Sequence, residues 1–129
     1  MYAINIMNKF EKAYIYQIKC NLTNDIYIGS SYEPMRIRLS KHLTDLKGWQ
    51  GIDGNKYRNY RSSFEVLMND DYEMTKVEDF PCNTKKELLS RESLYIIKAR
   101  NDDNINIVNK QIPSKITYSE DDLSSLVAF

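Results

Sequence analysis

Residues 13–29 of the chain are AYIYQIKCNLTNDIYIG, two runs of β-branched and aromatic residues on either side of a polar centre. Such runs are typical of β-strands, so we predict strands over 13–20 and 26–29. The intervening residues 21–25 favour a turn, because Asn and Asp side chains bond to nearby backbone groups and tolerate left-handed geometry. The segment therefore predicts a β-hairpin with a loop of about five residues.

After the hairpin, apolar residues recur every three or four positions, which is typical of an amphipathic α-helix. This helix is expected to begin at Pro34 and to end at Gly48. Arg38 and His42 are four residues apart, so we expect them on one face of the helix, away from the centre of the apolar stripe.

Four further elements are expected in chain order: a helix over 57–68, a strand over 72–80, a helix from Thr84 to about Arg100, and a short extended segment over 105–108. Thr84 supports the start of the last helix, because a threonine three residues before a glutamate can form a capping box. Only a short helix is expected after Ser119. These elements predict an α+β fold with a small central antiparallel β-sheet flanked by helices. We expect an N-terminal extension over 1–12, one domain over 13–110 and a C-terminal tail over 111–129.

The charge balance limits the partners that the protein can bind. The 129 residues include 18 Lys and Arg and 18 Asp and Glu, which excludes a generally basic protein that coats nucleic acid. Residues 1–61 hold ten basic against five acidic side chains, whereas residues 62–129 hold eight against thirteen. A surface that binds phosphate is therefore expected to come mainly from the first half.

Two cysteines and one histidine exclude several kinds of site. Cys20 and Cys82 lie far apart and leave too few ligands for a structural zinc ion, and we expect both to be reduced and buried. A nucleophilic pair of either cysteine with His42 is formally possible, but no electropositive pocket is indicated around the thiols. We find no signal peptide and no membrane-spanning run, so we expect an intracellular protein.

Glu92 is out of place in the helix predicted from Thr84. Its neighbours three and four positions away on both sides are apolar, namely Leu88, Leu89, Tyr95 and Ile96. An unpaired buried carboxylate costs on the order of several kcal/mol, so such a group is usually paired or protonated. Three hypotheses follow: a salt bridge with an Arg or Lys at the edge of the core, a boundary position that reaches solvent, and a metal-binding or catalytic carboxylate.

The hairpin carries two tripeptides, Tyr14-Ile15-Tyr16 and Tyr27-Ile28-Gly29, that resemble the paired signature of the GIY-YIG nucleases. The resemblance continues in the family's order over residues 13–110. Its further matches are Arg38 with His42, then Arg91-Glu92 in the helix of the family's catalytic glutamate, and finally Asn109.

The chain departs from the family's pattern at a few positions. Tyr14 stands where the family usually has glycine, and Ser30 where some members have lysine. Arg38 is one residue further from the second motif than is usual, which leaves Arg36 as an alternative. Asn109 is expected to hold the backbone of the site, with the nearby Asn106 as its rival.

The resemblance implies a Mg²⁺- or Mn²⁺-dependent endonuclease that hydrolyses DNA and leaves 5′-phosphate and 3′-hydroxyl ends. Glu92 would be the only protein ligand of the metal, since Mg²⁺ keeps most of its waters. Tyr16 would act as the general base, and Arg38 and His42 would lower its pKa. Tyr27 would orient water or phosphate, and Arg38 would also stabilise the pentacovalent phosphate.

Contacts with DNA phosphates are expected from four basic residues: Lys41, Lys56, Arg58 and Arg61. The chain has no room for a separate DNA-binding domain, so we expect weak, salt-sensitive binding with little sequence preference. Because one active site cuts one strand, a double-strand break would require a homodimer or two binding events.

The competing hypothesis is a catalytically impaired domain that only binds nucleic acid. Tyr14, Ser30 and the inserted residue before Arg38 are the departures that favour it. The richness in Asn, Ile, Lys and Tyr is typical of an AT-rich genome, such as that of a large DNA virus or phage. A virus-encoded or mobile-element nuclease acting in the cytoplasm or nucleus of the cell is therefore one expected role.

Overall fold

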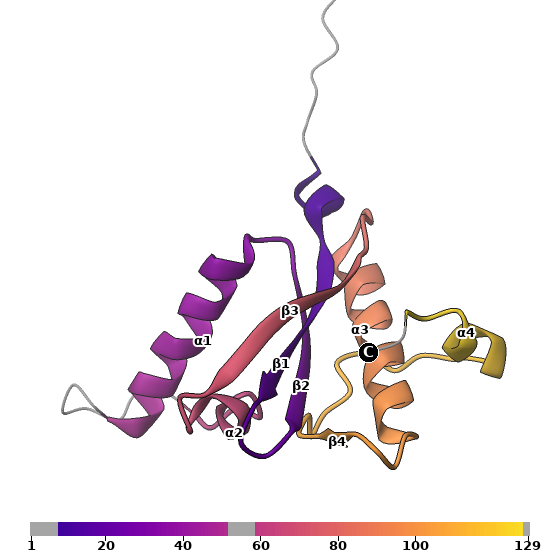
Figure 1. Cartoon of the computed structure of the whole chain (residues 1–129). Helices are drawn as coiled ribbons and strands as arrows, with labels where there is room; N and C mark the ends of the chain where they lie inside the picture. Colours follow the sequence, from indigo (N-terminus) through magenta and orange to yellow (C-terminus); the bar gives the residue numbers. More distant parts are fainter. Residues whose placement is uncertain (1–7, 52–58, 128–129) are drawn as a thin grey trace, which may run out of the picture.

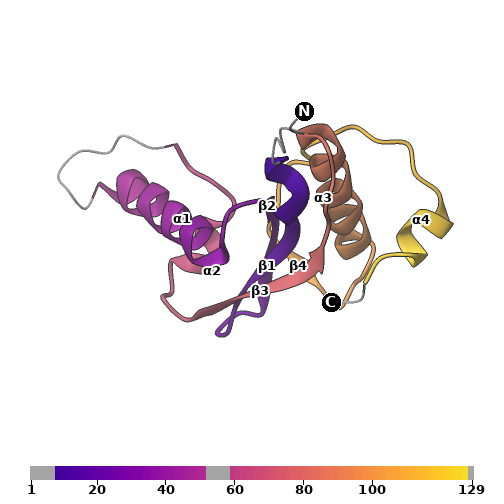
Figure 2. The ribbon, with the colours of Figure 1, turned by 90° about the horizontal axis from the view of Figure 1, so that it is seen from above.

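Four strands form one sheet, and helices cover both of its faces (Figure 1 and Figure 2). The computed structural model describes residues 8–51 and 59–127. Its elements in chain order are a 3-10 helix (Lys9–Lys12), β1 (Tyr14–Cys20), β2 (Asp25–Ser31), α1 (Met35–Gln50), α2 (Phe64–Leu67), β3 (Tyr72–Asp79), α3 (Lys85–Arg100), β4 (Asn106–Ile107) and α4 (Glu120–Ser124). The α+β class predicted from the sequence is confirmed.

The predicted hairpin is confirmed as β1 and β2, which pair antiparallel. Asn24, in the loop between them, has the left-handed backbone geometry that the turn chemistry favours, with φ of 63°. β3 pairs antiparallel with the other side of β1, whereas β4 pairs parallel with the first two residues of β2, Asp25 and Ile26. The sheet has the order β3-β1-β2-β4 and is therefore mixed, because the short fourth strand adds a parallel pair to the expected antiparallel sheet.

The two faces of the sheet support two separate hydrophobic clusters. On one face, Ile15 and Ile28 pack in a cluster with residues of α3. On the other face, Tyr16 and Ile18 pack in a cluster with residues of α1 and α2. Viewed from above, α1 and α2 lie on one side of the sheet and α3 on the other, with α4 outside α3 (Figure 2). Side chains of α1 and α3 can therefore meet only around an edge of the sheet.

Helix α1 differs from its predicted form in two respects. It continues through Gly48, which is buried, and ends at Gly51, whose φ of 72° and bond from its N–H to the Lys47 carbonyl at 3.0 Å terminate the last turn. The glycine that ends the helix is thus the one that adopts left-handed geometry. His42 does not lie away from the core but is only 2% exposed, because α1 turns this face toward the sheet.

The predicted helix over 57–68 is wrong in length. The described part of this segment contains only the single turn of α2, and Tyr57 lies outside the described residues. Tyr60 instead packs its ring against Trp49 and Phe64, with ring centroids 5.3 and 5.7 Å away. Tyr60 and Phe64, whose spacing indicated a helix, therefore belong to an aromatic cluster with Trp49 of α1.

The remaining predicted elements are confirmed. Thr84 caps α3, since its hydroxyl oxygen accepts a hydrogen bond from the Glu87 N–H at 3.2 Å. Cys20 and Cys82 are both free and buried, as expected. Within the described residues, no helix combines the length and the apolarity needed to cross a lipid bilayer.

Candidate active site

The sequence-predicted residues gather at the edge of β2. Because β4 pairs only with the first two residues of β2, the later part of β2 is left without a neighbouring strand on that side. A cleft of about 450 Å³ opens there. The residues lining this cleft come mainly from β2, α1, α3 and the segments before α2 and after β4: Tyr27, Arg38, His42, Tyr60, Arg61, Ser62, Glu92, Asn109, Lys110, Gln111 and Pro113.

A buried hydrogen-bonded chain lies at the base of the cleft. The Tyr16 hydroxyl is 2.6 Å from Nε2 of His42, and Nδ1 of His42 is 3.1 Å from the Ser63 hydroxyl. All three residues are at most 2% exposed. The strand β1, the helix α1 and the residue before α2 therefore hold one another through polar groups that water does not reach.

Both Tyr16 and His42 are neutral in this arrangement. Burial raises the pKa of Tyr16, and this effect outweighs the opposing positive charge of Arg38. Burial, followed by the charges of Arg38 and Arg61, lowers the pKa of His42 to about 3. Arg38 lowers the pKa of Tyr16, as expected, but burial raises it by more, so the pKa of Tyr16 is raised overall in the protein alone.

Tyr27 lines the cleft beside this buried chain. Its ring centroid lies 5.5 Å from that of His42 and 6.4 Å from that of Tyr16. Burial, with a smaller contribution from the negative charge of Glu92, raises the pKa of Tyr27 to about 12. Its hydroxyl is therefore protonated at neutral pH and can donate a hydrogen bond.

Gly29 is a position where only glycine fits without a shift. It pairs with Tyr16 across the two strands, and the Tyr16 ring lies directly over it. A Cβ atom at Gly29 would overlap Cζ and the hydroxyl oxygen of Tyr16. The glycine of the second tripeptide thus makes room for the tyrosine of the first.

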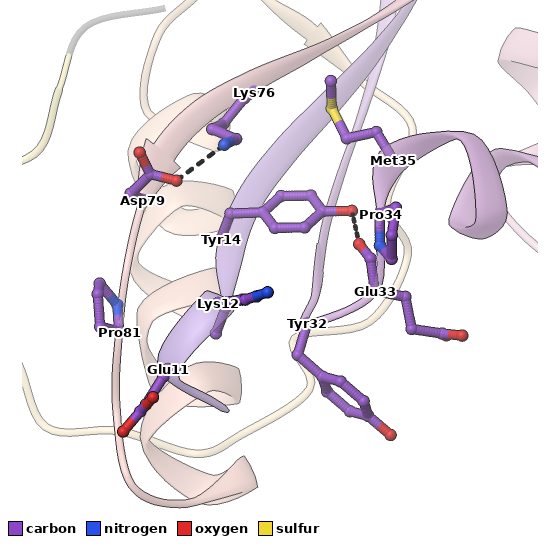
Figure 3. Close-up of a pocket in the computed structure, with 11 residues that line it drawn as sticks. Glu11, Lys12, Tyr14, Tyr32, Glu33, Pro34, Met35, Lys76, Asp79 and Pro81 are labelled. Carbon is purple, nitrogen blue, oxygen red and sulfur yellow. Dashed lines mark hydrogen bonds and ion pairs between the residues drawn. The ribbon is translucent and has the colours of Figure 1, made fainter. Parts of the chain in front are cut away.

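Tyr14, two residues before Tyr16, points to a different place. Its hydroxyl donates a hydrogen bond to the Glu33 carbonyl at 2.5 Å, and its ring lines a separate hollow of about 610 Å³ (Figure 3). That hollow contains none of the predicted catalytic residues. The tyrosine in place of glycine therefore leaves the contact between Gly29 and Tyr16 untouched.

Glu92 reaches the cleft from α3, on the other side of the sheet. The Ser30 hydroxyl donates a hydrogen bond to its Oε1 at 2.6 Å, and no ion pair to Glu92 is found among the described residues. Burial raises the pKa of Glu92 to about 7, although the Ser30 hydrogen bond and the charge of Arg38 both oppose the rise. The ionised carboxylate is therefore poorly compensated by the protein itself.

This pKa predicts how stability depends on pH. The folded-state pKa is above the unfolded value, so the folded protein binds more protons between the two, and stability is lost as the pH rises through this interval. The free energy of unfolding of the wild type, measured with urea in EDTA, is expected to fall by about 3 kcal/mol relative to Glu92→Gln from about pH 4 to pH 8. The exposed Glu73 gives a matched control, since Glu73→Gln should show no such trend. A difference between wild type and Glu92→Gln that is independent of pH would contradict the buried carboxylate.

The structure distinguishes Arg38 from Arg36, and Asn109 from Asn106, by where each residue lies. Arg38 lines the cleft, whereas Arg36 is exposed on α1 and is not among the residues lining it. Asn109 donates to the Ile28 carbonyl at 2.8 Å and accepts from the Ile28 N–H at 2.9 Å, as a strand neighbour would. Asn106 is exposed and bonds to Asp25 at the far end of β2.

A model of the GIY-YIG catalytic domain matches residues 12–106. The chain belongs to the GIY-YIG family. No curated protein and no solved structure matches it. GIY-YIG domains are usually nucleases, and this supports an endonuclease activity for the chain.

The donor groups of this GIY-YIG domain fit a metal held by one carboxylate. Within residues 8–51 and 59–127, no group of three or more His, Cys, Asp and Glu side chains is placed to hold a metal ion. Neither Cys20 nor Cys82 is among the residues lining the cleft, and His42 is bonded to Tyr16 and Ser63 instead. A single half-buried carboxylate open to solvent and phosphate suits Mg²⁺, which prefers oxygen ligands and keeps several waters.

The predicted DNA contacts of the GIY-YIG domain are only partly brought to the cleft. Arg61 lines it and lies 3.4 Å from Asp45, while Lys41 is ion-paired with Glu33 at 2.7 Å beside it. Lys56 and Arg58 lie outside the described residues.

Several residues of the site were missed by sequence reasoning. Ser63 supports His42, while Tyr60 and Lys110 line the cleft. Ser30 had been noted only as a departure from the family's pattern, whereas it is the hydrogen-bond partner of Glu92. Only the position of Ser30, directly after Gly29, could have indicated a role in the site.

Proposed function

We propose that this GIY-YIG domain is a divalent-metal-dependent endonuclease that hydrolyses DNA phosphodiester bonds and leaves 5′-phosphate and 3′-hydroxyl ends. The observation that carries the proposal is the meeting of two groups from opposite faces of the sheet. His42, whose Nε2 is 2.6 Å from the buried Tyr16 hydroxyl, and Glu92, from α3, line one cleft together with Arg38. Family membership supports the reaction class.

Glu92 is the residue that would hold Mg²⁺ or Mn²⁺. The metal would polarise the phosphate and offset the charge that develops on it. Ser30 orients the carboxylate through its hydrogen bond to Oε1. The high pKa of Glu92 fits this assignment, because a cation in the cleft would supply the countercharge that the protein lacks.

Proton transfer and binding of the phosphate are assigned to the other residues of the site. We assign to the Tyr16 hydroxyl the role of accepting a proton from the attacking water. As it does so, Tyr16 gives its own proton to Nε2 of His42 across their 2.6 Å contact. A phosphate bound beside Arg38 and Arg61 would offset two of the charges that lower the pKa of His42. Tyr27 would donate a hydrogen bond to water or phosphate, and Arg38 would bind the phosphate oxygens.

Asn109 would hold β2 in place through its hydrogen bonds to Ile28. Because the family model matches only residues 12–106, these bonds favour a domain boundary beyond that match. We therefore propose residues 13–110 as the nuclease domain, with 1–12 as an N-terminal extension and 111–129 as a C-terminal tail. A single cleft of this kind would cut one strand at a time, so a double-strand break would need two copies or two binding events.

A binding-only domain is the second candidate, and one observation favours it. Tyr16 is fully buried and its pKa is raised, so in the unbound protein its hydroxyl is protonated and can accept a proton only if it gives up its own. Nicking of supercoiled plasmid in Mg²⁺ separates the two candidates. We expect nicking that EDTA abolishes. A folded protein that binds DNA but cleaves neither plasmid nor single-stranded or branched oligonucleotides in Mg²⁺ or Mn²⁺ would favour the binding-only domain.

A further inference from the structure

A second hollow adjoins the cleft at Glu92. Its volume is about 370 Å³, and Arg38 and Glu92 line both spaces. One space extends from them toward Tyr60 and Lys110, and the other toward Tyr32 and Lys9. The predicted metal ligand thus lies where the two spaces meet, not at the closed end of either.

Basic side chains outnumber acidic ones along this path. The cleft has three basic residues against Glu92 alone, and the second hollow has four against Glu33 and Glu92. The hollow around Tyr14 has the opposite balance, with two lysines against three carboxylates (Figure 3). A polyanion therefore fits the path over Glu92 better than the hollow around Tyr14.

An exposed tyrosine with an adjacent lysine stands at each end of the path. Tyr32 is 40% exposed, and Nζ of Lys9 lies 5.3 Å from its ring centroid. Tyr60 is 36% exposed, and Nζ of Lys110 lies 5.0 Å from its ring centroid. Figure 3 shows the hydroxyl end of Tyr32 directed away from Tyr14.

Both rings are held in place by edge-to-face contacts with other aromatic residues. Tyr32 packs against Phe10 at 5.3 Å between centroids, and Tyr60 packs against Trp49 and Phe64. A fixed aromatic ring next to a flexible ammonium group can bind a base by stacking and the adjacent phosphate by charge. Bases inside a duplex are already stacked on one another, so only unpaired bases can use such rings.

We propose that the cleft and the second hollow form one groove for a single DNA strand, with unpaired bases stacked on Tyr32 and Tyr60 on either side of Glu92. The substrate class is DNA with an unpaired segment around the cleaved bond. The position of that bond rests on the proposed nuclease function, whereas the binding of an unpaired strand does not.

The test measures DNA binding without cleavage. The Glu92→Gln protein in EDTA is titrated into a fluorescently labelled single-stranded oligonucleotide and into the blunt duplex of the same sequence, with anisotropy as the readout. We expect the single strand to bind about tenfold more tightly than the duplex. Added to this protein, Tyr32→Leu and Tyr60→Leu should each weaken binding of the single strand about fivefold or more and leave the duplex unchanged.

Tyr118 provides the matched control. It is 43% exposed and lines neither the cleft nor the second hollow. Tyr118→Leu should leave binding of both oligonucleotides unchanged. If Tyr60→Leu fails to fold, as judged by circular dichroism, Tyr32→Leu alone decides. Equal binding of duplex and single strand, or no effect of Tyr32→Leu, would overturn the proposal.

Cleavage of the same oligonucleotides by the wild type in Mg²⁺ keeps the two proposals apart. If the duplex is cut as fast as the single strand and the cutting requires Glu92, the groove proposal fails while the nuclease function stands. If neither is cut, but binding of the single strand depends on Tyr32 and Tyr60, the groove stands and the nuclease function fails.

Discussion

Replacing Glu92 with glutamine is expected to lower the rate of plasmid nicking in Mg²⁺ by about 10³-fold, while the protein keeps its fold. Glutamine has the same size and can still accept the hydrogen bond from Ser30. It lacks the negative charge that would hold a divalent cation in a cleft where no other carboxylate is among the lining residues. The nicking rate should therefore fall because metal binding is lost, and not because the protein unfolds.

The control for this variant is Glu73→Gln, which removes a carboxylate from the exposed face of β3 and should nick at the wild-type rate. Urea unfolding at pH 8 should show Glu92→Gln to be at least as stable as the wild type, because the ionised carboxylate is disfavoured by burial. A Glu92→Gln protein that nicks at the wild-type rate would show that the metal is held elsewhere.

The local features of this fold could be predicted from the sequence, because neighbouring residues determine them. The hairpin follows from two runs of β-branched and aromatic residues around a turn, and the start of α3 follows from a cap completed within four residues. Glu92 could be singled out for the same reason, since this charged residue has the apolar neighbours Leu88 and Ile96 on the same face of one helix. Its partner, Ser30, lies 62 residues away on strand β2.

Features that depend on distant packing could not be predicted. His42 and Ser63 are 21 residues apart, and their contact exists only because α2 packs against α1. The raised pKa of Tyr16 has the same origin, because the segments that bury it are far along the chain. Sequence reasoning assessed Arg38 by its charge and could not weigh that charge against desolvation.

The C-terminal end of α1 is a further feature that differs from the prediction. Gly48 and Gly51 are both plausible stops by composition, and the choice depends on which one adopts left-handed geometry. Gly48 is buried within the helix instead. No pattern of spacing along the sequence shows which of the two glycines ends the helix.

Replacing Tyr16 with phenylalanine is expected to lower the nicking rate by about 10²- to 10³-fold. The change removes a single oxygen, so the ring still fills the space over Gly29 and the cleft keeps its shape. It also leaves Nε2 of the buried His42 without its hydroxyl partner, which should cost about 1–3 kcal/mol of stability. Rates are therefore to be compared at a temperature at which both proteins are fully folded.

Tyr72→Phe is the matched variant, because Tyr72 packs against the same hydrophobic cluster from β3 but does not line the cleft. It should keep the wild-type rate. If Tyr16→Phe also keeps that rate, Tyr16 serves only to pack against Gly29 and to hold His42, and the proton must pass to another group. Tyr27 is then the next residue to change, because it lines the cleft and its ring centroid lies 5.5 Å from that of His42. A loss in Tyr27→Phe alone would transfer the role of proton acceptor from the first tripeptide to the second.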